Sequence, residues 1–258
     1  MRAQVGFFTD SSICIGCKAC EVACKEWNNV PEDGFTWLGN SYDNTGGLSA
    51  NSWRHVAFIE QEQDGAVRWL MNSDVCKHCT EAACLEVCPT GAIFRSEFGT
   101  VVVQEDVCNG CGYCVAACPF GVIGRREIHG HAKGAAQKCT LCYDRLRVGE
   151  QPACAKACPT ESIHFGDMDD IRQMARDRLA EVEEEGVEGA RLYGLDESNG
   201  VGGTGAFFLL LDQPEAYGLP SDPVTPTRHL GETWRAAAAA TGAMVFAVAA
   251  AVIAGRRT

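Results

Sequence analysis

Apolar and polar residues alternate in several short stretches of this chain, and these stretches predict strands. The segment "RHVAFIEQEQDGAVRWLMN" (54–72) has two alternating runs joined by Asp64 and Gly65, which predicts a hairpin. The runs "AIF" (92–94) and "TVVV" (100–103) predict a second hairpin that turns at 97–99, and "AFFLLL" (206–211) predicts a further strand. Strands therefore occur on both sides of the middle of the chain.

A helical period appears in "DMDDIRQMARDRLAEVEEEG" (167–186). Asp167 is a suitable N-cap and Gly186 a suitable stop signal. The predicted apolar face consists of Ile171, Met174, Ala175, Leu179 and Val182. Such a face usually packs on a core.

The longest apolar stretch is "AAAAATGAMVFAVAAAVIA" (236–254), which carries no charge. Arg235 flanks it on one side and Arg256 and Arg257 on the other, and Trp234 lies at its start. A helix of this length rises about 28 Å, close to the hydrocarbon thickness of a bilayer. We predict a transmembrane helix at 235–255; an alanine-rich soluble helix is the alternative.

The charge of the chain excludes one class of partner. The formal net charge is −12, so nucleic acid, which requires clustered Lys and Arg, is not an expected partner. Aromatic residues make up only 8% of the chain, so the core between residues 10 and 165 is expected to be thin. Bound inorganic centres would then contribute to the stability of the fold. The N-terminus lacks the long apolar run of a signal peptide.

The sixteen cysteines fall into four groups of four. The groups are Cys14, Cys17, Cys20, Cys24; Cys76, Cys79, Cys84, Cys88; Cys108, Cys111, Cys114, Cys118; and Cys139, Cys142, Cys154, Cys158. A proline follows the last three groups, whereas Lys25 follows the first. Three closely spaced cysteines and a more distant fourth are typical of iron–sulfur proteins. Structural zinc prefers paired C-x2-C knuckles, and disulfides require an oxidising compartment.

In two-cluster ferredoxins, three cysteines of a motif bind one cluster and the fourth binds the neighbouring cluster. Applied to this chain, the rule predicts four [4Fe–4S] clusters whose iron is bound by all sixteen cysteines. The predicted ligand sets are Cys14, Cys17, Cys20, Cys158 (site 1); Cys139, Cys142, Cys154, Cys24 (site 2); Cys76, Cys79, Cys84, Cys118 (site 3); and Cys108, Cys111, Cys114, Cys88 (site 4). His78 is then expected beside a cluster or at the surface, not as a ligand.

Closed sites of this kind leave no open iron position for a substrate, and no catalytic set of side chains is recognisable elsewhere. The chain is therefore interpreted as a carrier of electrons without a catalytic residue. Positive side chains in or beside the motifs could stabilise reduced clusters, although each could equally be an ordinary surface partner: Lys18, Lys77, Lys133, Lys138, Arg125 and Arg126. The run "GVGGTG" (200–205) matches a dinucleotide fingerprint, but it precedes a strand where the fingerprint requires a helix.

The motifs "CIGCKACEVACKEWN", "CNGCGYCVAACPFG", "CTLCYDR" and "DQPEAYGLP" resemble those of the four-cluster iron–sulfur subunits of molybdenum or tungsten bis-pterin oxidoreductases. Within that family the chain is most similar to the β subunits of membrane-bound formate dehydrogenase. The resemblance implies an α+β fold of two ferredoxin-like modules, one nested in the other, and a C-terminal transmembrane helix. The expected divisions are a four-cluster domain at 1–165 with an insertion at 27–75, an extension at 166–219, a linker at 220–234 and the helix.

The same resemblance implies the partners. Formate would be oxidised on a separate molybdenum or tungsten subunit, and electrons would pass through this chain to a membrane cytochrome b and quinone. The terminal arginines favour a globular part on the outer face of the cell membrane. Two rival functions remain open: the equivalent subunit of a hydrogenase or sulfur-compound or sulfoxide reductase complex, and a non-redox module with structural metal.

Overall fold

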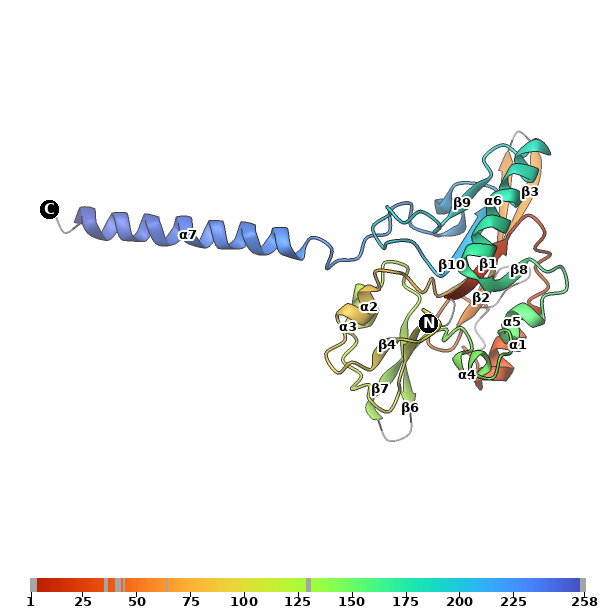
Figure 1. Cartoon of the computed structure of the whole chain (residues 1–258), viewed down its shortest axis with the longest axis horizontal. Coiled ribbons are helices and arrows are strands. Elements are labelled where there is room, and N and C mark those ends of the chain that lie inside the picture. Colours follow the sequence, from red (N-terminus) through yellow and green to blue (C-terminus); the bar gives the residue numbers. More distant parts are fainter. Residues whose placement is uncertain are drawn as a thin grey trace. The chain divides into compact units, whose positions relative to one another are not determined.

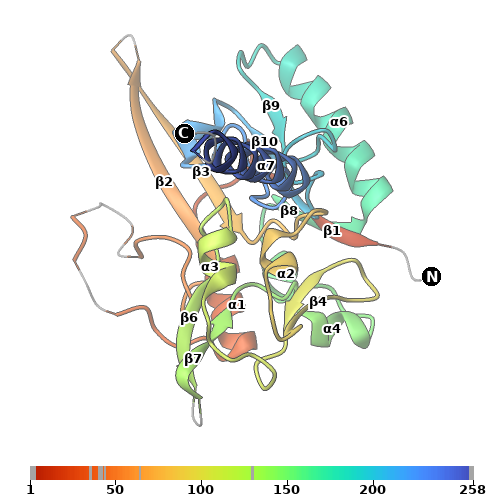
Figure 2. The same ribbon diagram turned by 90° about the vertical axis from the view of Figure 1, so that its left-hand side faces the viewer.

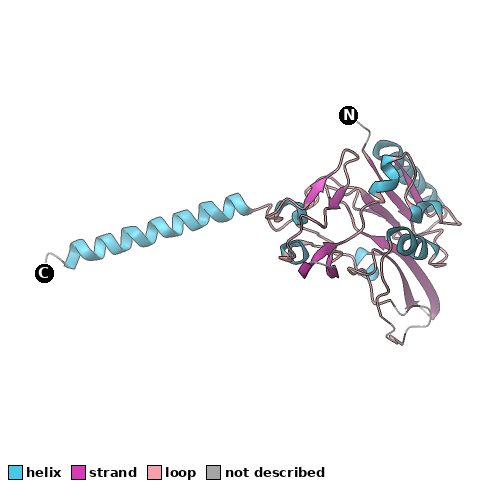
Figure 3. Ribbon diagram, turned by 90° about the horizontal axis from the view of Figure 1, so that it is seen from below, coloured by secondary structure: helices cyan, strands magenta, loops and turns pink. Residues whose placement is uncertain are grey.

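The computed structural model describes residues 4–34, 37–39, 43, 45–63, 65–128 and 131–255. The chain forms two compact units, Met1–Thr225 and Pro226–Thr258. Figure 3 shows that the first unit combines short helices and strands, and that the second consists mainly of one long helix.

A four-stranded sheet organises the first unit. Its strands are β1 (Val5–Asp10), β8 (Ile163–Asp167), β9 (Arg191–Tyr193) and β10 (Ala206–Leu210), in the order β8-β1-β10-β9. Strands β1 and β10 are parallel, and both outer pairs are antiparallel. The sheet therefore joins the start of the chain to segments that follow the last cysteine.

The two faces of this sheet pack against different hydrophobic cores. Helix α6 (Met168–Glu184) covers one face, where Phe8, Phe207 and Leu209 pack against Ile171 and other α6 residues (Figure 1). Alternate residues of the same strands, such as Phe7, Phe208 and Leu210, belong to a second core that includes several buried cysteines. Alternation along the strands thus separates an ordinary apolar layer from the cysteine-rich layer.

The helix predicted from residue 167 is confirmed. Asp167 caps it by accepting a hydrogen bond from the Asp169 N–H at 3.0 Å. Of the predicted apolar face, Met174 is an exception, because it is 43% exposed. It lies beyond the edge of the strip that contacts the sheet.

Three hairpins extend from the sheet region. The predicted hairpins form as β2 (Arg54–Gln63) with β3 (Ala66–Val75) and β4 (Ile93–Arg95) with β5 (Val101–Val103), although Asp64 at the first turn lies outside the described residues. A third, β6 (Gly124–Ile128) with β7 (His131–Gln137), was not expected from the sequence. Figure 2 shows the β2–β3 pair as the longest of these arms.

Five short helical segments complete the globular unit: α1 (Ala19–Asn28), α2 (Ala83–Glu86), α3 (Tyr113–Ala117), α4 (Tyr143–Arg147) and α5 (Ala153–Lys156). A 3-10 turn, η1 (Pro214–Tyr217), follows β10. Helix α1 packs on α5, and α2 packs on α3. The first and fourth cysteine groups therefore meet in space, as do the second and third.

The second unit contains helix α7 (Leu230–Gly255), of 26 residues. Among the described residues it is the one helix long and apolar enough to cross a membrane. Its length is about 39 Å at the usual rise per residue, more than a bilayer's hydrocarbon core requires. Arg256 and Arg257 lie outside the described residues.

Candidate iron–sulfur sites

The short helices carry cysteines in pairs separated by four residues. In each pair the first cysteine lies in a helix, and the second lies either in the same helix or just beyond its end; the pairs are Cys20 and Cys24, Cys84 and Cys88, Cys114 and Cys118, and Cys154 and Cys158. Residues four apart lie on the same face of a helix, about one turn from each other. Each pair can therefore serve two neighbouring sites.

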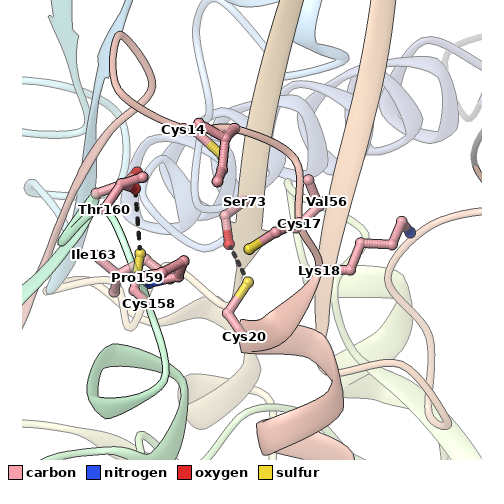
Figure 4. A pocket seen from close by; sticks show the side chains of 12 residues that line it. Cys14, Cys17, Lys18, Cys20, Val56, Ser73, Cys158, Pro159, Thr160 and Ile163 are labelled. Atoms are coloured by element: carbon pink, nitrogen blue, oxygen red, sulfur yellow. Dashed lines mark hydrogen bonds between the residues drawn. The ribbon is translucent and has the colours of Figure 1, made fainter.

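Site 1 is a small pocket lined by Cys14, Cys17, Cys20 and Cys158. The four sulfurs come from the two ends of the cysteine-rich region, and Figure 4 shows them around one space. The Cys20 Sγ lies 3.3 Å from the Ser73 Oγ, and the Cys158 Sγ lies 3.8 Å from the Thr160 Oγ1. Hydroxyl groups thus accompany the sulfurs at the cavity wall.

Site 3 is a small pocket lined by Cys76, Cys79, Cys84 and Cys118. Site 4 is a small pocket lined by Cys88, Cys108, Cys111 and Cys114. In site 4 the Ala136 N–H donates to the Cys108 Sγ at 3.4 Å. Both sites combine cysteines from α2 and α3, the helices that pack on each other.

The cysteines of site 2 are all buried. Burial raises the pKa of the Cys24 thiol, and the nearby sulfurs of Cys139, Cys154 and Cys142 raise it further. The side-chain amide of Asn28 lies 3.7 Å from the Cys24 sulfur and 4.0 Å from the Cys142 sulfur, and donates toward both. The four sulfurs of the predicted set are therefore mutual neighbours.

Electrostatic contacts also connect one site to the next. Cys154 of site 2 is among the groups that raise the pKa of Cys20 in site 1, after the larger effect of burial. Cys76 of site 3 likewise raises the pKa of Cys139 in site 2. Cys114 of site 4 raises the pKa of Cys84 in site 3. These contacts relate the four sets in the order 1, 2, 3, 4.

The donor sets fit a polynuclear iron–sulfur group better than a single ion. A four-thiolate zinc site would hold every sulfur about 2.3 Å from one ion. Within the part of the chain that the structure describes, no three Cys, His, Asp or Glu side chains converge closely enough to hold one metal ion. All sixteen cysteines are free, and in three sets they surround a cavity.

Burial makes these thiols weak acids in the absence of a metal. It raises the pKa of Cys84 to about 12 and that of Cys114 to about 11, and neighbouring sulfurs contribute. At neutral pH both thiols would therefore be protonated. Binding of iron, which requires thiolates, would displace these protons and be coupled to formation of the core.

Buried cations adjoin the sites, as the sequence suggested for some of its Lys and Arg residues. Lys138 is 2% exposed, lines the site 3 cavity and donates to the carbonyls of Val101 and, at 3.0 Å, Cys139. Lys77 also lines that cavity, but its amine forms an ion pair with Asp74 and lies over the ring of Phe208.

Lys18, Arg125 and Arg126 lie in less buried positions. Lys18, at the edge of site 1, forms ion pairs with Glu21 and Asp43. Arg125 is exposed, Arg126 lies over the Trp53 ring, and the side chain of Lys133 lies outside the described residues.

Arg54 and Ser73 were missed by the sequence reasoning. Arg54 is 1% exposed, and its surrounding sulfurs raise its pKa, although burial acts in the opposite direction. Its position at the start of an alternating strand could have indicated an inward side chain. Nothing in the sequence indicated which site it would reach.

The "GVGGTG" run covers site 3. The carbonyls of Val201 and Gly203 accept hydrogen bonds from the N–H groups of Glu81 (2.8 Å) and Thr80 (3.0 Å), in the widened gap between Cys79 and Cys84. A side chain at Gly205 would place its Cβ 3.3 Å from His78. The glycines of the run allow the two backbones to pack closely. Strand β10 follows the run, whereas a dinucleotide fingerprint needs a helix at that position.

His78 lies beside site 3. It is 3% exposed, has a positive φ of 47°, and its Nδ1 accepts a hydrogen bond from the Val101 N–H at 3.1 Å. Burial lowers the pKa of His78, and the charges of Lys138, Arg95 and Arg54 lower it further. A neutral imidazole in this position fastens β5 to the cysteine loop.

We predict that His78→Ala leaves the iron content unchanged and lowers the free energy of unfolding by about 1–3 kcal/mol, because the buried Val101 N–H loses its acceptor. His78→Asn is the matched control, since Asn tolerates a positive φ and has an acceptor oxygen. Iron analysis and denaturant unfolding measure the two effects. Loss of one cluster from both variants would contradict the assignment and make His78 a ligand.

Comparison with known proteins agrees with this chemistry. Two models of a 4Fe-4S dicluster domain match residues 53–168 and 13–92. The chain is 44% identical over 230 residues to the iron-sulfur subunit of the nitrate-inducible formate dehydrogenase of Escherichia coli. The aligned region covers 88% of this chain and 76% of that protein. It is 42% identical to the formate dehydrogenase iron-sulfur subunit of Haemophilus influenzae, with 86% and 70% covered.

A more distant relationship covers less of the chain. The B subunit of the anaerobic dimethyl sulfoxide reductase of Escherichia coli is 41% identical over 187 residues, which are 70% of this chain and 82% of that protein. Sixteen cysteines and two dicluster domains correspond to four [4Fe–4S] clusters, the centres of an electron-transfer protein. The chain belongs to the family of iron–sulfur subunits that accompany formate dehydrogenases.

Proposed function

We propose that this chain conducts electrons between a formate-oxidising catalytic subunit and a membrane partner. When bound, its four clusters supply reversible one-electron chemistry. The observation that carries the proposal is the gathering of the cysteines into sets, in three of which the four cysteines line a common pocket. The effect that sulfurs of one set have on the pKa of the next supports a continuous series. Electron transfer benefits from closely spaced, dry and rigidly held centres, and the buried cysteines of site 2 suit this requirement.

We further propose the sixteen-cysteine ligand assignment given by the ferredoxin rule, with sites 1 and 2 in one module and sites 3 and 4 in a module nested within it. The common cavities and the packing of α1 on α5 and α2 on α3 support this arrangement. In this assignment Cys24 serves site 2 even though no proline follows it. The functional divisions at 1–165, 166–219, 220–234 and 235–255 belong to the same proposal.

The two terminal sites are proposed as the points of electron entry and exit. Each contains an exposed cysteine, Cys17 in site 1 and Cys111 in site 4, whereas all the cysteines of site 2 are buried. The chain leaves the globular unit at Thr225, whose hydroxyl donates to the Glu81 carbonyl beside site 3. We assign the site 4 end to the membrane partner and the site 1 end to the catalytic subunit.

The partners follow from the relatives and from α7. The names of the relatives support a catalytic subunit that acts on formate, for which we propose a molybdenum or tungsten bis-pterin centre. The membrane partner is proposed to be a cytochrome b that passes electrons to quinone. No substrate site is assigned to this chain.

An equivalent role in a sulfoxide reductase complex is the second candidate, supported by the dimethyl sulfoxide reductase relative. That relative covers 70% of this chain, compared with 88% for the formate dehydrogenase subunit. The greater coverage favours formate.

The first test concerns the ligand sets. Cys20→Ser and Cys24→Ser change the same helix at positions one turn apart, and we expect them to disturb different clusters, site 1 and site 2 respectively. EPR spectra of the reduced protein, with iron analysis, should show different signals altered in the two variants and four clusters in the parent. Identical spectral losses in both variants, or none in Cys24→Ser, would refute the pairing.

The second test concerns the substrate. In the complex isolated with its partner subunits, formate should reduce the clusters, and metal analysis should find molybdenum or tungsten. Dithionite provides the positive control for cluster reduction. Reduction by dithionite but not by formate would reject the formate assignment and keep the electron-transfer role.

The third test concerns the membrane. We propose that α7 anchors the chain and that the globular unit lies on the outer face. Alkaline carbonate should then leave the full-length chain in the membrane fraction, and protease added to inside-out vesicles should not cleave the globular unit. Cleavage in intact inside-out vesicles, with detergent-permeabilised vesicles as the control, would reverse the orientation.

A further inference from the structure

Arg54 is a cation in the interior of the globular unit. Its side chain extends from the first residue of β2 and is 1% exposed, and its guanidinium lies over the Phe7 ring at 4.9 Å. It belongs to none of the cysteine motifs.

The hydrogen bonds of Arg54 leave part of the guanidinium unused. Nη1 donates to the Ser73 Oγ at 2.9 Å and to the Ser73 carbonyl at 3.2 Å. Nε and Nη2 are fully buried and have no oxygen or nitrogen partner among the residues that the structure describes, and the sulfur of Cys154 is a hydrogen-bonding neighbour of the guanidinium. Within that same part of the chain, no Asp or Glu forms an ion pair with Arg54.

A buried charge without a counter-ion is strongly unfavourable. The groups that surround Arg54 are cysteine sulfurs, namely Cys154, Cys139 and Cys24 of site 2 and Cys20 of site 1. Burial raises the pKa of the Cys154 thiol, and the charge of Arg54 opposes that rise. The anionic partner that Arg54 requires is therefore the thiolate and sulfide charge of two adjacent sites.

Ser73 extends the influence of Arg54 to site 1. Because the Ser73 oxygen accepts from Nη1, its own proton is free to point at the Cys20 sulfur, 3.3 Å away (Figure 4). The remaining donors, Nε and Nη2, are available to sulfur in site 2. One side chain can thus stabilise negative charge in both sites.

We propose that Arg54 is the shared positioning residue of sites 1 and 2, and that its fixed charge raises the reduction potentials of both clusters. The inference rests on the proposed ligand sets. Reduction adds one electron, and hence one negative charge, to a cluster. A nearby cation and hydrogen bonds to sulfur favour that state. Arg54 is neither oxidised nor deprotonated in the process, because guanidinium stays charged in proteins.

The test is a redox titration, followed by EPR, of the full chain purified with its partner subunits. Arg54→Gln removes the charge and Arg54→Lys retains it. Arg145→Gln is the matched control, since Arg145 is 5% exposed but is paired with Glu150 at 2.8 Å and lies over the Trp27 ring. Iron content establishes whether each variant still holds four clusters.

In Arg54→Gln we expect the ratio of reduced to oxidised cluster, measured at a fixed ambient potential, to fall roughly tenfold or more at sites 1 and 2. This fall corresponds to a reduction potential lower by about 59 mV for a one-electron couple. Sites 3 and 4 should be unchanged. In Arg54→Lys, which keeps the positive charge, the potentials of sites 1 and 2 should stay close to those of the parent protein. Arg145→Gln should leave the site 1 potential unchanged, because Arg145 is paired with Glu150 and the sulfur on which it acts, Cys142, belongs to site 2.

Unchanged potentials in an Arg54→Gln variant that keeps four clusters would overturn the inference. Equal loss of clusters from Arg54→Gln and Arg54→Lys would also overturn it, because it would show a requirement for shape and not for charge. Loss in Arg54→Gln with retention in Arg54→Lys would support the role of the charge. Failure of the parent protein to bind reducible clusters would instead reject the proposed function.

Discussion

Negative charge held away from water is the constraint on which this structure depends. Most of the sixteen sulfurs are buried or partly buried, and burial together with neighbouring sulfurs raises the pKa of thiols such as Cys84 and Cys114. Iron supplies the main compensation, and the fold supplies the rest through buried cations. Lys138 and Arg54 lie among sulfurs with neutral oxygen partners, whereas Lys77 is neutralised by Asp74. Lys77 also opposes the rise in the pKa of Cys79, but its charge is shared with Asp74.

The sheet connects the electron-transfer sites to the rest of the molecule. Its outer face packs on α6, so the ordinary apolar layer lies apart from the sulfurs, while its inner face presents Phe7 beneath Arg54 and Phe208 beneath Lys77. The segment between β9 and β10 hydrogen-bonds to the loop of site 3, so residues far beyond the last cysteine hold a cysteine loop in place. The C-terminal extension is therefore structurally coupled to the sites and not only a connection to α7.

The sequence by itself determined what is encoded in local spacing. Cysteine intervals indicated iron–sulfur chemistry, alternating residues predicted β2–β3 and β4–β5, and Asp167 correctly began α6. Uniform apolarity likewise predicted α7. These signals are readable because helix period, strand alternation and ligand spacing involve residues a few positions apart.

Tertiary structure alone decided how distant segments combine. The pairing of β1 with β10 joins residues about two hundred positions apart, and the hairpin β6–β7 had no clear alternation. The positions of Arg54 and Ser73 beside two cysteine sets, and the use of "GVGGTG" as a cover for site 3, also depend on this assembly. Long-range packing selects which side chains become buried together, and local sequence patterns contain no record of that choice.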